Sequence, residues 1–320
     1  MASAIVAIRS AVKPYLQACE AGDVVLVAVS GGADSLALSA AVFREATALA
    51  VTPIAVTINH QLQEGSRTQA EKVKAQLIDI GYSDVIIEDV NVSMSGGLEA
   101  GARAARYEAL DRILEAKGAK QIYLGHTRDD QAETVLLGLA RGSGTRSLSG
   151  MAAKNKNYIR PLLTITRIET EKACSELGLN TWNDPHNQNS EFTRVRVRKN
   201  VLPVMEENLG PGICAALARS ASLFRDDADA LDEIAERESQ GLNLAELDCS
   251  YLASLPRAIR SRVLRKAIYA AGAPTGAISA EHLADIEALV TDWHGQGESS
   301  LPGGVKVSRI SGRLSLSARQ

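Results

Sequence analysis

The feature that most constrains this chain is a repeated alternation of short apolar strands and longer helices in its first half. Residues 23–29 form a continuous apolar run rich in valine, as in strands that are buried on both faces. Similar runs recur at 53–59, 85–92 and 121–125, and helical stretches separate or follow them, at 35–50, 68–80, 98–117 and 130–141. This alternation predicts right-handed βαβ units and a doubly wound parallel sheet of the α/β class.

The pattern changes near Gly210. Helical stretches now follow one another at 213–239, 255–271 and 279–291, and alternating residues at 305–316 predict a terminal hairpin. A length of 320 residues exceeds one average domain. We therefore expect a catalytic α/β domain over residues 1–209 and a smaller, mainly helical domain over residues 210–320.

Composition excludes several classes of protein. No apolar run approaches the roughly 20 residues of a membrane span, and the N-terminus lacks the apolar centre of a secretory signal. The four cysteines are scattered with no Cys-x-x-Cys pair, which argues against a zinc site, an iron–sulfur cluster or a disulfide framework. We expect a cytoplasmic protein without a membrane partner. Because the net charge is −3, nucleic acid could bind only at local basic patches.

A glycine-rich turn joins the first strand to the first helix of the sheet. Its residues are Ser30, Gly31, Gly32, Ala33, Asp34 and Ser35. Ligands bind at the carboxyl ends of parallel strands, glycines let a ligand approach the backbone, and a helix N-terminus attracts phosphate. The turn lacks the lysine of Gly-x4-Gly-Lys-Ser/Thr and the spacing of Gly-x-Gly-x-x-Gly.

Asp34 adds a carboxylate to this phosphate cradle. A carboxylate beside a phosphate is repulsive unless a cation lies between them, so Asp34 predicts Mg²⁺. The alternative is an ordinary strand–helix turn in which Asp34 and Ser35 cap the helix. We prefer the nucleotide site because the turn closes a buried strand.

Two further clusters fall near the same edge of the predicted sheet. Asp130 and Glu133 share one face at the start of a helix, where the helix dipole stabilises carboxylates, and they suit an ammonium group or a metal. The alternative is a well-capped helix with surface acids. Arg103, Arg106 and Tyr107 also share one helix face, and an arginine fork fits a carboxylate or phosphate. Solvent-facing arginines are the alternative there.

The glycine turn matches the Ser-Gly-Gly-x-Asp-Ser loop of the ATP pyrophosphatases, in which this PP-loop holds the pyrophosphate part of ATP. Several motifs together resemble the family of tRNA(Ile)-lysidine synthetases over most of residues 23–205. They are Ser30–Ser35, Asn59-His60, Glu99-x3-Arg103-x2-Arg106-Tyr107, His126-x2-Asp129-Asp130-Gln131-x-Glu133-Thr134, Arg141-Gly-Ser-Gly144, Arg160-Pro161-Leu162, Asn183-Asp184-Pro185 and Thr193-Arg194-x-Arg196-x-Arg198 with Leu202-Pro203. The family often has Asn where Val195 stands and His where Thr127 stands.

The resemblance implies a reaction and its participants. ATP, with Mg²⁺, adenylates the C2 oxygen of the wobble cytidine in the isoleucine tRNA with a CAU anticodon, and L-lysine then displaces AMP to form lysidine. Ser30–Ser35, His60 and His126 would bind the nucleotide, with Asp34 on the metal. Arg106 would bind the lysine carboxylate, and Asp130 and Glu133 would receive its amino groups and a proton.

Two basic clusters are candidate tRNA contacts. The first comprises Arg194, Arg196, Arg198 and Lys199, and the second includes Arg260 and Arg265 on a C-terminal helix. Lysine and arginine contacts to phosphates give salt-dependent affinity. The alternative for both clusters is a solvated helix face.

Two rival functions stay open at this point. A tRNA thiolase has the same ATP loop, but thiolases of this type generally use a cysteine pair that the chain lacks. A non-catalytic nucleotide or RNA-binding module would not need Asp34, Arg106, Asp130 and Glu133 together. The sequence leaves the oligomeric state open, a homodimer included.

Overall fold

The computed structural model describes residues 3–61, 65–93, 97–142, 144–182 and 190–318. The chain divides into two compact units, one of residues 1–142 and 148–222 and one of residues 143–147 and 223–320. The sequence-based boundary at 209/210 stays a prediction. No helix in the described ranges is long and apolar enough to cross a membrane.

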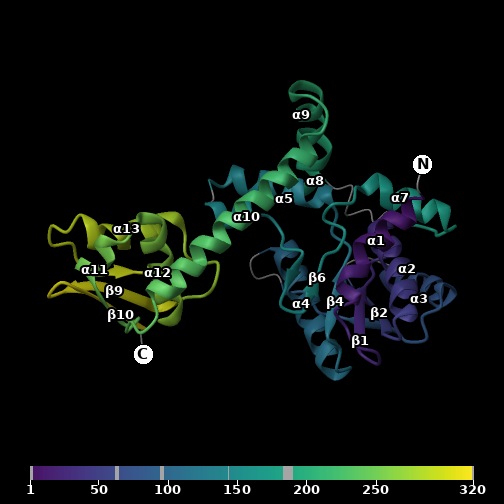
Figure 1. Ribbon diagram of the computed structural model, residues 1–320, viewed down its shortest axis with the longest axis horizontal. Coiled ribbons are helices and arrows are strands. Elements are labelled where there is room, and N and C mark those ends of the chain that lie inside the picture. Colours follow the sequence, from purple (N-terminus) through teal and green to yellow (C-terminus); the bar gives the residue numbers. More distant parts are fainter. Residues whose placement is uncertain (1–2, 62–64, 94–96, 143, 183–189, 319–320) are drawn as a thin grey trace. The chain divides into compact units, whose positions relative to one another are not determined.

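A six-stranded sheet in the order β3-β2-β1-β4-β6-β5 forms the centre of the first unit (Figure 1). Every pairing in it is parallel except that of β5 with β6, which confirms the predicted α/β class. The strands are β1 (Val24–Ala28), β2 (Thr52–Asn59), β3 (Val85–Asp89), β4 (Gln121–Leu124), β5 (Lys154–Asn155) and β6 (Tyr158–Ile159).

Alternate residues of β1 enter two different cores. Val25 and Val27 pack with the cluster that contains Leu36, while Leu26 packs on the other face with Leu110 and Ile122. All of these side chains are buried. The continuous apolar run therefore reflects a central strand that is covered on both faces.

Helices cover both faces of the sheet (Figure 1). One face packs against α1 (Ala4–Leu16), α2 (Ala33–Ala48), α3 (Ser66–Ile80) and α7 (Arg167–Glu176), and the other against α4 (Leu98–Ala116). Helix α1 is an addition to the elements predicted from the sequence. Its buried residues Ala4, Ile8, Val12 and Leu16 recur every four positions, which is the spacing of one helix face.

The strand order places the two candidate loops side by side. Strands β1 and β4 are neighbours in the sheet. The other neighbour of β1 is β2, and the other neighbour of β4 is β6. Such a switch point opens a crevice beyond the carboxyl ends of the strands. Gly125 follows β4, and a Cβ there would lie 3.0 Å from the Asp34 carbonyl oxygen. Glycine at 125 therefore lets the two loops approach closely.

The rest of the first unit packs on α5 (Arg128–Ala140). Ala132 of α5 contacts Val197 and Leu202, which lie in a π-helical turn, η2 (Val197–Val201), and in α9 (Leu202–Leu209). The turn continues α8 (Thr193–Arg196). The short helix α6 (Thr145–Leu148) follows α5 in the chain, and its residues 145–147 belong to the second unit. This packing brings the first basic cluster next to the start of α5.

The second unit has its own core and a four-stranded sheet in the order β7-β10-β9-β8. Antiparallel β9 and β10 confirm the predicted hairpin, whereas β7 and β8 were not predicted because they are three and two residues long. Helix α10 (Ile213–Glu238) begins in the first unit and belongs to the second from residue 223 onward. The other elements are β7 (Glu246–Asp248), α11 (Cys249–Ser254), α12 (Arg257–Ala270), α13 (Ala280–Thr291), β8 (Ser299–Ser300), η3 (Pro302–Gly304), β9 (Val305–Ile310) and β10 (Arg313–Ala318).

Replacing Leu36 with Ala tests the core beneath the glycine turn. Leu36 is fully buried, so we expect Leu36→Ala to cost about 2–5 kcal/mol in the free energy of unfolding. Leu139 is 51% exposed, and Leu139→Ala should cost less than about 0.5 kcal/mol. Urea denaturation followed by circular dichroism measures both, and equal losses would contradict this packing.

Candidate active site

A hollow of about 700 Å³ lies beyond the carboxyl ends of β1, β2 and β4. It joins most of the predicted nucleotide and lysine residues with two of the predicted tRNA residues. Those that line it are Ser30, Gly32, Ala33, Asp34, Ser35, His60, Arg106, His126, Asp130, Arg194 and Arg198. Segments separated by up to about half the chain therefore meet in one pocket.

The two glycines of the turn serve different purposes. Gly31 has a φ of +88°, and a Cβ there would lie 2.6 Å from the Val73 side chain, so both conformation and space require glycine. Gly32 has a φ of −74°, which other residues also adopt. A Cβ on Gly32 would lie 3.8 Å from Ser30 Oγ and 3.9 Å from the Trp182 carbonyl oxygen, which are ordinary van der Waals distances. Space therefore does not require glycine at this position, but the lack of a side chain keeps the backbone open to the pocket.

The backbone of the turn is held by its own side chains. The Ser30 N–H donates to Ser35 Oγ at 3.1 Å, and Ser35 Oγ donates to the Gly32 carbonyl at 3.0 Å. Among the described residues, the N–H groups of Gly32, Ala33 and Asp34 have no acceptor. Because these amides open α2, they are available to an anion, as is usual at a helix N-terminus.

Asp34 contacts α7 from the edge of the pocket. Thr170 Oγ1 donates to its Oδ1 at 2.5 Å, and Arg167 Nε lies 3.4 Å from its Oδ2. Burial raises the pKa of Asp34 to about 6, although Arg167 and Thr170 oppose this rise. The ionised carboxylate is therefore poorly compensated and suited to a further cation.

The two carboxylate oxygens of Asp130 have different contacts, one with the start of its own helix and the other with arginines. The N–H and Oγ1 of Thr127 donate to Oδ2 at 2.8 and 3.0 Å, which caps α5. Oδ1 lies 3.3 Å from Arg167 Nη2 and 3.5 Å from Arg198 Nη2. Burial opposes ionisation, but Arg167 and His126 outweigh it and lower the pKa of Asp130. Asp130 is thus both helix cap and charged wall of the site.

Glu133 lies behind the pocket rather than in its wall. Its side chain is fully buried, and Arg198 Nε and Nη2 donate to its two oxygens at 2.6 and 3.2 Å. Arg194 Nε lies 3.3 Å from the second oxygen. This differs from the predicted direct contact with a substrate amine, because the ammonium would have to replace Arg198.

Three arginines surround the phenol of Tyr107. The guanidinium of Arg103 lies 4.8 Å and that of Arg106 lies 5.6 Å from the centre of the ring, and Arg160 Nη2 donates to the hydroxyl at 3.2 Å. Arg106 Nε is buried without a hydrogen-bond partner among the described residues. Burial and the neighbouring Arg103 lower the pKa of Arg106. This positive end of the pocket can bind a carboxylate or phosphate.

His126 stands between the acidic and basic ends of the pocket. Burial lowers its pKa to about 3, and the nearby Arg106 and Arg160 add to this fall while Asp130 opposes it. The imidazole is therefore neutral near pH 7. A neutral ring can form hydrogen bonds with a base or ribose, but it cannot supply positive charge to a phosphate.

Comparison with known proteins identifies the family. The PP-loop domain family matches residues 6–205, and the TilS substrate binding domain matches residues 247–315. The tRNA(Ile)-lysidine synthase of Thermobifida fusca is 49% identical over 97% of this chain and 97% of its own length. That of Streptomyces coelicolor is 50% identical over 91% and 84%. The chain belongs to the tRNA(Ile)-lysidine synthase family.

A solved structure supports the same fold. The U34-tRNA thiolase NcsA from Methanococcus maripaludis, solved with its [4Fe-4S] cluster, superimposes with a TM-score of 0.58 at 18% identity. The match covers 69% of this chain and 80% of the thiolase. At this identity the likeness concerns the PP-loop fold. The reaction is indicated by the lysidine synthase relatives.

Sequence reasoning missed the contribution of α7 to this lysidine synthase pocket. Arg167 and Glu171 line the hollow, and Thr170 contacts Asp34. The capping box at Thr166 fixes the start of the helix and thereby places these three residues on one face. That spacing was visible in the sequence, but nothing in it indicated that the face meets the glycine turn. Trp182, which also lines the hollow, was missed as well. Its backbone N–H donates to the Gly31 carbonyl at 2.9 Å.

The predicted tRNA-binding residues have different surroundings. Arg196 and Lys199 are exposed, and Arg196 donates to the carbonyls of Ser190 and Glu191. Arg260 is buried, and all three of its guanidinium nitrogens donate to Glu287 or to the Leu255 carbonyl. Its predicted contact with tRNA is therefore corrected to a structural role. The motif at 183–185 lies outside the described residues.

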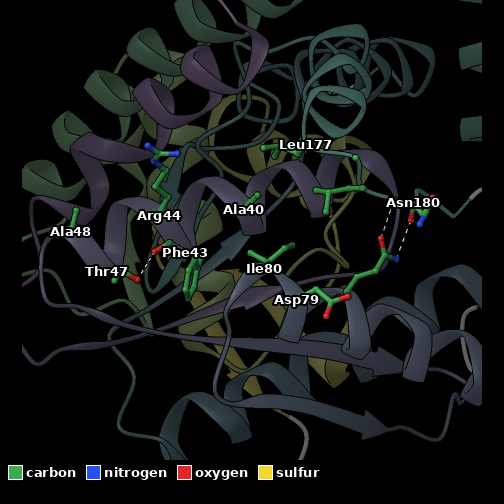
Figure 2. Close-up of a pocket in the computed structure, with 12 residues that line it drawn as sticks. Ala40, Phe43, Arg44, Thr47, Ala48, Asp79, Ile80, Leu177 and Asn180 are labelled. Atoms are coloured by element: carbon green, nitrogen blue, oxygen red, sulfur yellow. Dashed lines mark hydrogen bonds between the residues drawn. The ribbon is translucent and has the colours of Figure 1, made fainter.

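A second hollow of about 750 Å³ shares no lining residue with the first (Figure 2). Its wall comes from α2, α3 and the residues after α7, and includes Phe43, Ile80 and Leu177. Gln76 exchanges hydrogen bonds with the backbone of Asn180 across one end. None of the predicted site residues lines it, so size alone does not locate the chemistry.

The pKa of Asp34 predicts a pH-dependent stability. Between the unfolded value of 3.8 and the folded value of about 6, the native state keeps a proton that the unfolded chain has lost. Stability from this group therefore falls as pH rises through that window. We expect the melting temperature of Asp34→Asn to rise relative to that of the parent protein between pH 4 and pH 7. Both are measured without nucleotide or divalent cation. A constant difference would contradict the assignment.

Paired arginine variants test the roles on α12. Removing Arg260 leaves buried Glu287 without its main partner, so Arg260→Gln should cost about 3–5 kcal/mol in stability. Arg265 is half-buried with one long bond to the Ile278 carbonyl, and Arg265→Gln should cost less than about 1 kcal/mol. Thermal denaturation distinguishes them. A large loss for Arg265→Gln alone would reverse the assignment.

Proposed function

We propose that this chain uses ATP to join lysine to the wobble cytidine of the isoleucine tRNA with a CAU anticodon. The observation that carries the proposal is one pocket that joins unpaired backbone amides, two carboxylates and an arginine end. The amides suit the phosphates of ATP, the carboxylates suit a metal or the amino groups of lysine, and the arginines suit the lysine carboxylate. The lysidine synthase relatives supply the reaction for which the parts are used.

The first step is adenylation. The C2 oxygen of cytosine attacks the α-phosphorus of ATP, the bond to the β-phosphate oxygen breaks, and pyrophosphate leaves. The amides of Gly32, Ala33 and Asp34 would hold the departing phosphates. Neutral His126 would donate or accept a hydrogen bond beside the base or ribose. The adenylate then provides a far better leaving group than hydroxide.

Asp34 and Asp130 would hold Mg²⁺. Among the described residues no group of three or more metal-ligating side chains occurs, but Mg²⁺ commonly uses one or two carboxylates together with substrate phosphates. The two carboxylates fit this pattern because both lie within 3.4 Å of the guanidinium of Arg167, so a cation is already accommodated between them. The ion would neutralise the triphosphate during the first step.

The second step transfers lysine. Its ε-amine attacks C2 of the adenylated cytosine, the bond from C2 to oxygen breaks, and AMP leaves. Arg106 would bind the lysine carboxylate, since its Nε has no described partner. Asp130 would receive an amino group and accept the proton that the ammonium loses. Glu133 would join it if Arg198 turned away, because an ammonium can replace a guanidinium.

The remaining parts of the proposal concern partners. Arg196, Lys199 and Arg265 are the basic side chains that we assign to tRNA phosphates, with Arg194 and Arg198 at the pocket itself. A cytoplasmic location belongs to the same proposal, and a homodimer is compatible with it. A thiolase activity is not favoured, because none of the four cysteines of this chain lines the pocket. They are Cys19, Cys174, Cys214 and Cys249, and all are free.

Incorporation of labelled lysine into unmodified tRNA tests the function directly. With ATP and Mg²⁺, the parent protein should label the minor isoleucine tRNA and no other. Arg106→Gln should raise the KM for lysine about 10–100-fold through loss of a charged hydrogen bond. Arg112→Gln is the matched control, because Arg112 is an exposed arginine of α4 paired with Glu88.

Two outcomes would contradict the proposal. Label that never enters RNA would exclude the reaction itself. Lysine-dependent ATP hydrolysis that survives intact in Asp130→Asn and Glu133→Gln would exclude the assigned lysine site.

A further inference from the structure

The glycine turn lacks a positive charge of its own. Nucleotide-binding P-loops place a lysine on the β- and γ-phosphates, whereas residues 30–35 contain an aspartate and no basic residue. Backbone amides supply only partial charge. A fully charged side chain must therefore reach the triphosphate from another segment, or binding would depend on the amides and a metal alone.

Arg167 is the basic residue that contacts this turn. It is the first residue of α7, and its backbone N–H donates to Asp129 Oδ2 at 3.0 Å. The same helix is fixed to the turn by Thr170, which donates to Asp34, and by Cys174 Sγ, which donates to the Ala33 carbonyl at 3.3 Å. The backbone of Arg167 is thus held next to the phosphate cradle.

The guanidinium of Arg167 is only loosely engaged. Its two contacts, to Asp34 at 3.4 Å and to Asp130 at 3.3 Å, are longer than typical charged hydrogen bonds. The side chain lines the pocket and is 24% exposed. An arginine has five N–H donors, so donors remain for a ligand while the carboxylates keep the fork in place.

The other arginines that line the pocket have their described contacts outside the glycine turn. Arg103 and Arg106 lie against Tyr107, and Arg194 and Arg198 lie against Glu133. In the described part of the chain, Arg167 alone forms an ion pair with a residue of the glycine turn. It is therefore the arginine best placed for the pyrophosphate portion of ATP.

We propose that Arg167 is a phosphate-binding residue that takes the place of the P-loop lysine. Its guanidinium holds Asp34 and Asp130 together and binds the β- and γ-phosphates of ATP when the nucleotide enters the pocket. It would also stabilise the charge that grows on pyrophosphate as the α–β bond breaks. This inference rests on the proposed use of ATP and extends it to a residue on a third segment.

Binding of a non-hydrolysable ATP analogue and of AMP to the full chain tests the role. With Mg²⁺ present, Arg167→Gln should weaken binding of α,β-methylene ATP about 10–100-fold, because a charged hydrogen bond is worth about 1.5–3 kcal/mol. AMP lacks the β- and γ-phosphates, so its affinity should change less than about twofold. Arg167→Lys should recover part of the loss, since it keeps the charge but not the fork. Arg112→Gln should behave as the parent protein.

The outcomes separate this inference from the proposed function. If the parent protein does not bind the analogue, the use of ATP itself fails. If the parent binds it and Arg167→Gln binds it equally well, Arg167 does not contact the phosphates. An equal loss of analogue and AMP binding with a lowered melting temperature would also overturn the inference, because it would show that Arg167 only supports the fold.

Discussion

Two carboxylates, the half-buried Asp34 and the buried Asp130, share one guanidinium and determine the architecture of the site. Asp34 comes from the turn after β1, Asp130 from the start of α5 after β4, and Arg167 from the start of α7. Like charges at a partly buried position repel unless a cation lies between them. Three segments far apart in the sequence are therefore held at one point by charge, and we propose that the metal and the phosphates of ATP bind at the same point.

Backbone geometry explains why these segments can meet at the switch point between β1 and β4. Gly31 lets the turn reverse against Val73, and Gly125 lets the loop after β4 approach the turn. The start of α2 then presents amides without acceptors among the described residues. The charged side chains would determine which ligand binds, and the glycines leave space for a ligand to approach the backbone. The arginines around Tyr107 form the basic end of the pocket, opposite the glycine turn and its carboxylate.

The sequence predicted the parallel sheet, the glycine turn and several residues of the pocket wall, because apolar periodicity and turn chemistry are local properties. It did not predict which distant side chains pair. Glu133 shares a helix face with Asp130, but its partner Arg198 is 65 residues away and closes it off from the pocket. Arg260 was predicted to contact tRNA as part of a basic cluster, yet it is buried and paired with Glu287 on another helix. Arg167 was missed for the same reason, since its contacts join three separate segments.

A crystal of the complex with α,β-methylene ATP and Mn²⁺ is the most direct test of this site. An anomalous signal should lie beside the Asp34 carboxylate, with the β-phosphate on the amides of Gly32, Ala33 and Asp34. A nucleotide bound elsewhere, or a metal without contact to Asp34, would contradict the proposed chemistry.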